Sequence, residues 1–271
     1  MPPKCLHCNN NSDLSDPRTS IILTGSFIRK SDLKRIQRYR CKKCNKNFSQ
    51  ATFSICYWQK KRALNFKVFL LFCSGVSQRR SAILLTTNRK TVARKLMLMG
   101  RLAKDELFKL NQAYNLASHI EFDDLETFEH TKCKPLSVTM AVEHETRRIL
   151  GFEVSKMPAK GKLAALARKK YGSRSDERAQ ARHRLFKDLQ KLVTDQVLIK
   201  SDSNPHYLGD VKKYFPNGEH KTYLSRRGCV VGQGELKSGG YDPLFTLNHT
   251  FAMLRANISR LFRRTWNTTK D

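Results

Sequence analysis

Acidic side chains are scarce in this sequence, and long apolar runs are absent. The 271 residues contain 23 Asp and Glu against 52 Lys and Arg, which leaves a formal charge of +29. This imbalance argues against an ordinary metabolic enzyme and favours a polyanionic partner, with nucleic acid before an anionic membrane. The longest apolar run, Val68 to Cys73, is far shorter than the ~20 residues that span a bilayer. No apolar segment follows the opening Met-Pro-Pro-Lys, so we expect no signal peptide and a soluble intracellular protein.

The positive charge is unevenly distributed along the chain. Residues 1–118 carry a balance of +19, residues 119–150 carry −3, and the remainder is again basic. Residues 51–100 contain no Asp or Glu at all. Hydrophobic residues make up 39% of the chain, which is too many for a disordered basic tail and enough for folded domains. An acidic island inside such a protein indicates either an ordinary solvated surface or carboxylates that hold a metal ion.

The cysteine pattern predicts a structural zinc site. Two Cys-x-x-Cys pairs lie near the N-terminus, and this spacing lets both thiolates of a pair bind one Zn²⁺. The 32 residues between the pairs read as short strands with a turn at Thr24–Ser26, so we predict a zinc ribbon over residues 1–55. The predicted ligands are Cys5, Cys8, Cys41 and Cys44.

A basic helical block follows over residues 56–117. Ser74 and Gly75 stop a first helix, Ser77 caps a second, and Thr86–Asn88 leads into a third. A helix, a short turn and a helix with a basic leading end are typical of a helix-turn-helix, although an inert basic linker is the simpler alternative. The predicted DNA contacts are Arg79, Arg80, Arg89, Lys90, Arg94 and Lys95. Arg79 and Arg80 would serve equally well as phosphate clamps without sequence information.

The acidic island opens a third segment, residues 118–271. Strands are predicted at residues 119–128, 136–142 and 148–154, followed by a long charged helix at 163–192. A buried strand at 196–200 then ends near Asp202. This order is that of a ribonuclease H-like domain with a mixed sheet, so the fold class is a multidomain α+β or α/β protein. Asp123 and Asp202 can then lie side by side, where two Mg²⁺ or Mn²⁺ ions would neutralise them.

Five motifs together resemble a known family, the DDE transposases of short bacterial insertion sequences with zinc-ribbon heads. The motifs are Gln37–Cys44, the helix-turn-helix, Phe122–Phe128, Ser201–Tyr207, and Leu247–Arg255 with Arg260–Arg263. The resemblance covers nearly the whole chain. It implies a transposase that binds terminal inverted repeats and performs Mg²⁺-dependent strand cleavage and strand transfer. It also implies double-stranded DNA as partner (transposon ends and target), a homodimer or higher oligomer on DNA, and a bacterial cytoplasmic, nucleoid-associated location.

The catalytic residues carried over from the family are Asp123, Asp202 and a third ligand. The family has a Glu at the third position, where this chain has Asn248 when aligned on Arg255. Glu235 is a rival by spacing, and Asp124 replaces Asp123 if the strand slips by one residue. Arg255 and Arg263 are placed near the phosphate of the scissile strand. Two alternatives stay open: a decayed, purely DNA-binding protein, and a ribonuclease H-like nuclease without strand transfer.

Overall fold

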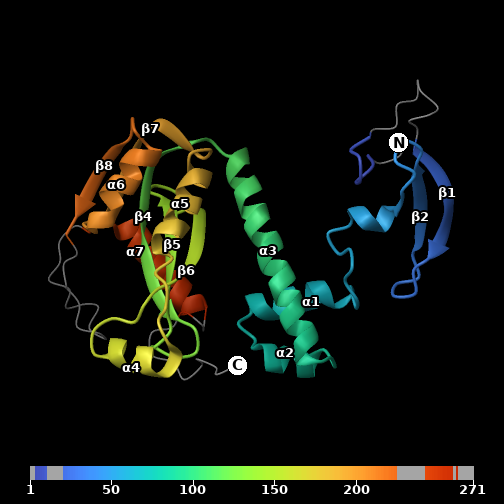
Figure 1. Cartoon of the computed structure of the whole chain (residues 1–271), viewed down its shortest axis with the longest axis horizontal. Helices are drawn as coiled ribbons and strands as arrows, with labels where there is room; N and C mark the ends of the chain where they lie inside the picture. The colour runs from blue at the N-terminus through green and yellow to red at the C-terminus, as the bar shows by residue number, and fades with distance from the viewer. Residues whose placement is uncertain (1–3, 11–20, 225–241, 259–260, 262–271) are drawn as a thin grey trace. The chain divides into compact units, whose positions relative to one another are not determined.

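The computed structural model of the chain describes residues 4–10, 21–224, 242–258 and 261. The chain divides into two compact units, Met1–Met99 and Gly100–Asp271. The architecture is mixed α/β, with a four-cysteine cluster in the first unit and a five-stranded mixed sheet in the second (Figure 1). Within the described ranges, none of the helices combines the length and the apolar character that a membrane span requires.

A three-stranded antiparallel sheet forms the first part of the first unit. Its order is β1 (Ile21–Ile28), β2 (Arg35–Cys41) and β3 (Asn47–Ser49), followed by a short 3₁₀ helix, η1 (Gln50–Phe53). The predicted turn at Thr24–Ser26 is wrong, because β1 continues through it with an irregular register between Leu23 and Ser26. Gly25 absorbs this irregularity at φ 91°, a conformation that residues with a Cβ avoid.

Three helices complete the first unit and lead into the second. They are α1 (Leu64–Cys73), α2 (Gln78–Leu84) and α3 (Arg89–Ala113). The predicted caps are confirmed, since the Ser77 hydroxyl accepts a hydrogen bond from the Arg80 N–H at 3.3 Å and the Asn88 side chain accepts one from the Lys90 N–H at 2.8 Å. Small buried side chains hold the three helices together, namely Val68, Ala82 and Val92.

The second unit is built on the five-stranded sheet, in the order β6-β5-β4-β7-β8. The predicted antiparallel meander is confirmed as β4 (Ala117–Phe128), β5 (Pro135–Glu143) and β6 (Ile149–Lys156). The next strand, β7 (Val193–Asp202), pairs in parallel with β4, and β8 (Glu219–Tyr223) adds a parallel edge that the sequence analysis missed. β8 is short and mostly polar, so it lacks the apolar alternation that identifies a strand.

Helices cover both faces of this sheet (Figure 1). On one face, α5 (Arg178–Leu189) and α6 (Pro205–Tyr214) pack onto a core that includes Phe122, Ile199 and Tyr207. On the other face, α7 (Phe245–Asn257) packs through Leu247 and Phe251 onto Leu125, Met140 and their neighbours. α6 directly follows β7, and α7 packs on β4. Helices on opposite faces of the sheet are therefore connected to the neighbouring strands β4 and β7.

The long helix predicted at residues 163–192 is wrong. The structure has α4 (Leu163–Tyr171) and then α5, separated by Gly172 and an extended link. Gly172 lies at φ 76°, which ends α4 in a conformation that a helix cannot continue. The break leaves α4 at the end of the sheet where β4 turns into β5 (Figure 1).

A matched pair of glycine substitutions tests the packing of β7. A Cβ at Gly218 would lie 2.9 Å from the carbonyl oxygen of Val197, whereas a Cβ at Gly209 in α6 would meet nothing within 4 Å. We expect Gly218→Ala to lower the free energy of unfolding by about 1–3 kcal/mol. Gly209→Ala should raise it by about 0.5–1 kcal/mol. Urea denaturation of both variants measures this, and equal stabilities would contradict the described packing.

Candidate metal centres and basic surfaces

The four cysteines of the two pairs converge at one point of the first unit. The Sγ atoms of Cys5 and Cys44 are 3.7 Å apart, as are those of Cys8 and Cys41. All four sulfur atoms lie within 4.8 Å of one another. Four thiolates bound tetrahedrally to zinc at 2.3 Å would be about 3.8 Å apart. The cluster therefore fits a metal ion such as zinc.

The two Cys-x-x-Cys turns repeat the same backbone geometry. The N–H groups of Cys5 and Cys41 each donate to the carbonyl five residues later, at 2.8 and 3.0 Å. The residue after each second cysteine is an asparagine in the left-handed region, Asn9 at φ 56° and Asn45 at φ 53°. Asn tolerates this region better than most residues with a Cβ. The repeated turn directs both thiols of each pair to the same side.

The pKa values of two of the clustered thiols are shifted in opposite directions. Burial acts to raise the pKa of Cys41, but hydrogen bonds from the Cys44 N–H and from the neighbouring sulfurs outweigh it and lower the pKa to about 7. A hydrogen bond from Asn10 acts to lower the pKa of Cys8, but burial and the adjoining thiols raise it to about 12. Without a cation, one thiolate suppresses ionisation of its neighbour, so metal binding would release protons.

The structure brings Asp123 and Asp202 together in the second unit. β4 and β7 are paired in parallel with Glu121 opposite Lys200. Asp123 and Asp202 each stand two residues further along these strands, at the end of β7. β4 also pairs with β5 without irregularity, so alternate residues share a face and Asp123 lies on the same side as Glu121. The two aspartates therefore occupy neighbouring positions on one face of the sheet.

The environment of this pair disfavours two negative charges. Burial raises the pKa of Asp123 to about 7, and the charges of Asp202 and Asp124 act in the same direction. Hydrogen bonds from the Asp124 N–H at 2.7 Å and the Tyr207 hydroxyl at 3.2 Å partly offset this. Burial also raises the pKa of Asp202, which accepts the N–H of Asn204 at 3.0 Å. A bound divalent cation would remove the repulsion.

Tyr207 is a site residue that the sequence analysis did not single out, although it closes the Ser201–Tyr207 motif. Burial, and then the charges of Asp124, Asp123 and Asp202, raise the pKa of its hydroxyl, so it remains a donor. Asp210 on the same helix accepts the Arg182 Nε at 2.8 Å, and the Arg182 guanidinium lies 5.2 Å from the Tyr207 ring centroid. These contacts join α5 to α6 beside the Tyr207 ring.

Asp124 has a different environment from Asp123. Its Oδ1 accepts a hydrogen bond from the Thr139 hydroxyl, the side chain opposite it on β5. Its Oδ2 is buried and has no hydrogen-bond partner in the part of the chain that the structure describes. Asp123 shares its face with Asp202, whereas Asp124 follows Phe122 toward the α5 and α6 face. The register of β4 and β7 places Asp123 on the face of Asp202, while the charge of Asp124 also raises the pKa of Asp202, so both carboxylates of β4 act on the end of β7.

Asn248 lies exposed in the first turn of α7. Its Nδ2 donates to the Asp242 carboxylate at 3.0 Å, and this described contact goes to neither Asp123 nor Asp202. Arg255 lies half-buried in the last turn of the same helix. The rival ligand Glu235 and the proposed phosphate contact Arg263 lie outside the described residues.

Glu121 docks α7 onto the sheet, a role that the sequence analysis missed. Its side chain is fully buried and accepts the Leu247 N–H at 2.8 Å, in the first turn of α7 where backbone donors lack helical partners. The other carboxylate oxygen contacts the His144 Nδ1 at 2.5 Å, and the Thr246 hydroxyl donates to the His144 carbonyl at 2.8 Å. The helix that carries Asn248 is therefore attached to β4 two residues before Asp123.

Most of the predicted DNA contacts in the first unit are exposed. These are Arg79, Arg80, Arg89, Lys90 and Arg94. Lys95 is a correction, because only 1% of it is exposed and burial lowers its pKa. Its ammonium donates to the Lys60 carbonyl at 3.2 Å and to the Asn65 side chain. Lys95 therefore connects α3 to the loop before α1 and to α1 itself, and it is not available as a DNA contact.

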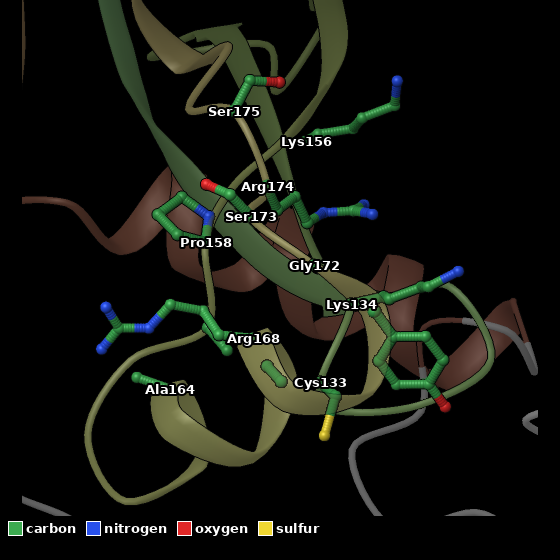
Figure 2. Close-up of a pocket in the computed structure, with 13 residues that line it drawn as sticks. Cys133, Lys134, Lys156, Pro158, Ala164, Arg168, Gly172, Ser173, Arg174 and Ser175 are labelled. Carbon is green, nitrogen blue, oxygen red and sulfur yellow. The ribbon is translucent and has the colours of Figure 1, made fainter.

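A basic pocket in the second unit was not anticipated (Figure 2). It has a volume of about 530 Å³ and lies between the β4–β5 turn, the end of β6 and α4. Figure 2 shows Arg168 on one side of it and Lys134 with Arg174 on the other. The sequence signal for it was available, since Lys156 to Arg174 contains seven basic residues and no acidic one. Two of the lining cations have carboxylate partners, since Arg174 pairs with Glu129 and Lys156 with Glu177, so Lys134 and Arg168 are the lining cations without a described carboxylate partner.

Comparison with known proteins adds no relative to this picture. A scan against protein-family models found no family that matches the chain, and a search of curated proteins found no significant match.

The cysteine cluster predicts about one Zn²⁺ per chain. Cys41→Ser removes a buried ligand at the centre of the cluster, so we expect it to lose most of the bound zinc and to unfold the ribbon. Cys73→Ser is the matched control, because Cys73 is exposed on α1 and lies outside the cluster. Metal analysis by mass spectrometry, with circular dichroism, measures both effects. Zinc-free wild-type protein with an intact ribbon would contradict the assignment.

The aspartate pair predicts that the stability of the folded protein depends on pH and on bound Mg²⁺. The folded-state pKa of Asp123 is about 7 against an ordinary 3.8, so metal-free stability should fall as the pH rises through this window. Asp123→Asn keeps the acceptor for Tyr207 and removes the charge, and should therefore stabilise the metal-free protein at pH 8 by about 1–2 kcal/mol. The same variant should lose the rise in Tm that Mg²⁺ gives the wild type.

Asp195→Asn is the control for this experiment, because Asp195 is exposed on β7. It should leave both the stability and the Mg²⁺ response unchanged. If Asp123→Asn destabilised the metal-free protein and kept the Mg²⁺ response, the aspartate pair would not be a cation site.

Proposed function

We propose that this protein is a DNA transposase of the DDE type in which an asparagine replaces the third acidic residue. The observation that carries the proposal is the juxtaposition of Asp123 and Asp202 on neighbouring parallel strands, with the pKa of each raised. Such a pair is unfavourable unless cations neutralise it. The order of meander, helix and parallel strand supports a ribonuclease H-like catalytic domain for the second unit.

In this proposal the side chains of Asp123 and Asp202 hold Mg²⁺ or Mn²⁺, and Tyr207 keeps the Asp123 carboxylate in place. The bound metal would supply activation of a water or 3′-hydroxyl and stabilisation of the leaving oxygen of a phosphodiester. Asn248 is the proposed third ligand through its amide oxygen, since the amide nitrogen is the atom that contacts Asp242. Glu121 keeps the helix of Asn248 attached to the same strand as Asp123.

The first unit is the proposed reader of the transposon ends. Its exposed arginines lie on and around α2 and the start of α3, which we interpret as a helix-turn-helix with α3 in the major groove. The zinc ribbon and the absence of acidic residues over 51–100 favour further contacts with phosphates. The pocket beside α4 offers the second unit a phosphate contact of its own. Two ends must be held together for transfer, which favours a dimer on DNA.

A second candidate is a sequence-specific DNA-binding protein without catalytic activity. The observation that favours it is the third position, because Asn248 carries no charge and its described contact is with Asp242. A ribonuclease H-like nuclease that cuts without joining is the remaining alternative. The three differ in what they do to the same DNA.

The deciding experiment uses labelled DNA from the two flanks of the gene, a target plasmid and Mg²⁺. We expect cleavage at the ends and joining to the target by the wild type. Asp202→Asn should lower both by at least about a hundredfold, because it removes a metal ligand, while Asp195→Asn on the same strand should retain them. Asn248→Glu should change the preference between Mg²⁺ and Mn²⁺.

Each alternative has its own outcome in this assay. Cleavage without joining identifies the nuclease, and retarded but uncut DNA identifies the DNA-binding protein. Full strand transfer by Asp202→Asn would overturn the catalytic assignment.

A further inference from the structure

Trp58 is strongly exposed in the first unit. It lies in the irregular loop between η1 and α1, residues 54–63, and 85% of its surface is accessible. The Tyr57 ring packs beside it with centroids 5.3 Å apart, and Ile55 in the same loop is 69% exposed. Tryptophan is a costly residue to leave in water, so an exposed aromatic pair marks a contact surface.

The loop holds Trp58 in an unfavourable backbone conformation. Trp58 lies at φ 64° and Lys61 at φ 51°, a region in which residues with a bulky side chain are rare. Two such residues within four positions are tolerated only where the surroundings enforce them, and this is common at functional sites.

Two lysines attach this loop to the start of α3. The buried Lys95 ammonium donates to the Lys60 carbonyl at 3.2 Å. The Lys61 ammonium donates to the Thr87 hydroxyl at 3.2 Å, and Thr87 immediately precedes the cap residue of α3. These contacts account for the burial of Lys95 and place the loop beside the basic end of α3.

We propose that Trp58 contacts bases of double-stranded DNA next to the segment contacted by α3. The inference rests on the proposed function, in that it takes the first unit to bind DNA. In a duplex, an apolar side chain contacts base faces by inserting between base steps and partly unstacking them, and the neighbouring Lys60, Lys61 and Arg62 would contact phosphates. These cations, and the absence of acidic residues from 51 to 100, favour DNA over a protein partner.

The chain has two tryptophans, so Trp266→Phe leaves Trp58 as the only tryptophan reporter. Titration of this variant with duplex DNA from the gene flanks should quench its fluorescence. Trp58→Ala in the wild-type background should weaken binding about tenfold or more, with an unchanged slope of affinity against salt. Arg80→Ala, which removes an exposed charge, should instead reduce that slope by about one.

Trp58→Gly separates the contact from the fold. Glycine accepts the left-handed conformation, so this variant should have a Tm at least equal to that of the wild type and still bind DNA as weakly as Trp58→Ala. Phe66→Ala, which truncates another exposed aromatic of the same unit, is the matched control and should bind normally. Unquenched fluorescence of Trp266→Phe on DNA, together with wild-type affinity of the Trp58 variants, would overturn the inference alone. Failure of the wild type to bind any DNA would overturn the proposed function.

Discussion

Parallel pairing of β4 with β7 is the constraint on which the candidate active site depends. Paired residues of these strands lie more than seventy positions apart in the sequence, and only the register of the strands places Asp123 beside Asp202. A shift of one residue in either strand would turn one carboxylate to the opposite face of the sheet. Apolar residues on both faces oppose such a shift, since Ile120 and Phe122 pack under α5 and α6 while Leu125 packs under α7.

Polar contacts of Asp123 and Glu121 with the neighbouring helices stabilise the same register of β4. The Tyr207 hydroxyl donates to Asp123 from α6, and the Arg182–Asp210 contact joins this helix to α5. Two residues earlier on β4, the buried Glu121 carboxylate accepts a backbone donor of α7 and contacts His144. Buried charges are stable only with such partners. The two networks meet on β4 within three residues, so the strand links both helical layers to the acidic pair.

Local patterns predicted the elements that depend on neighbouring residues. The meander, the caps at Ser77 and Asn88, and the cysteine cluster follow from apolar alternation, side-chain chemistry and ligand spacing, and the structure has them. The predicted long helix failed because Gly172 adopts a left-handed conformation that helical periodicity does not reveal. The polar edge strand β8 had no apolar signal to detect.

The roles of residues whose partners lie far away in the sequence could not be predicted from local patterns. In the sequence, Lys95 resembles the other surface cations of a basic helix. In the structure it is buried, and its ammonium donates to the Lys60 carbonyl and the Asn65 side chain. Glu121 looked like part of an acidic island, and its backbone partner lies 126 residues away. The faces on which Asp123 and Asp124 lie depend on the register of β4, which a single sequence leaves open by one residue.

The cysteine cluster would make the folding of the first unit, but not that of the second, depend on the supply of metal. The described core of the ribbon contains two of the cysteines themselves beside Ile21 and Phe48, whereas the second unit has apolar layers on both faces of its sheet. A metal bound between Cys8 and Cys41 would act as a cross-link that closes the intervening loop and lowers the entropy of the unfolded chain. The supply of metal would then control the folding of the first unit, while the second unit would stay folded without it.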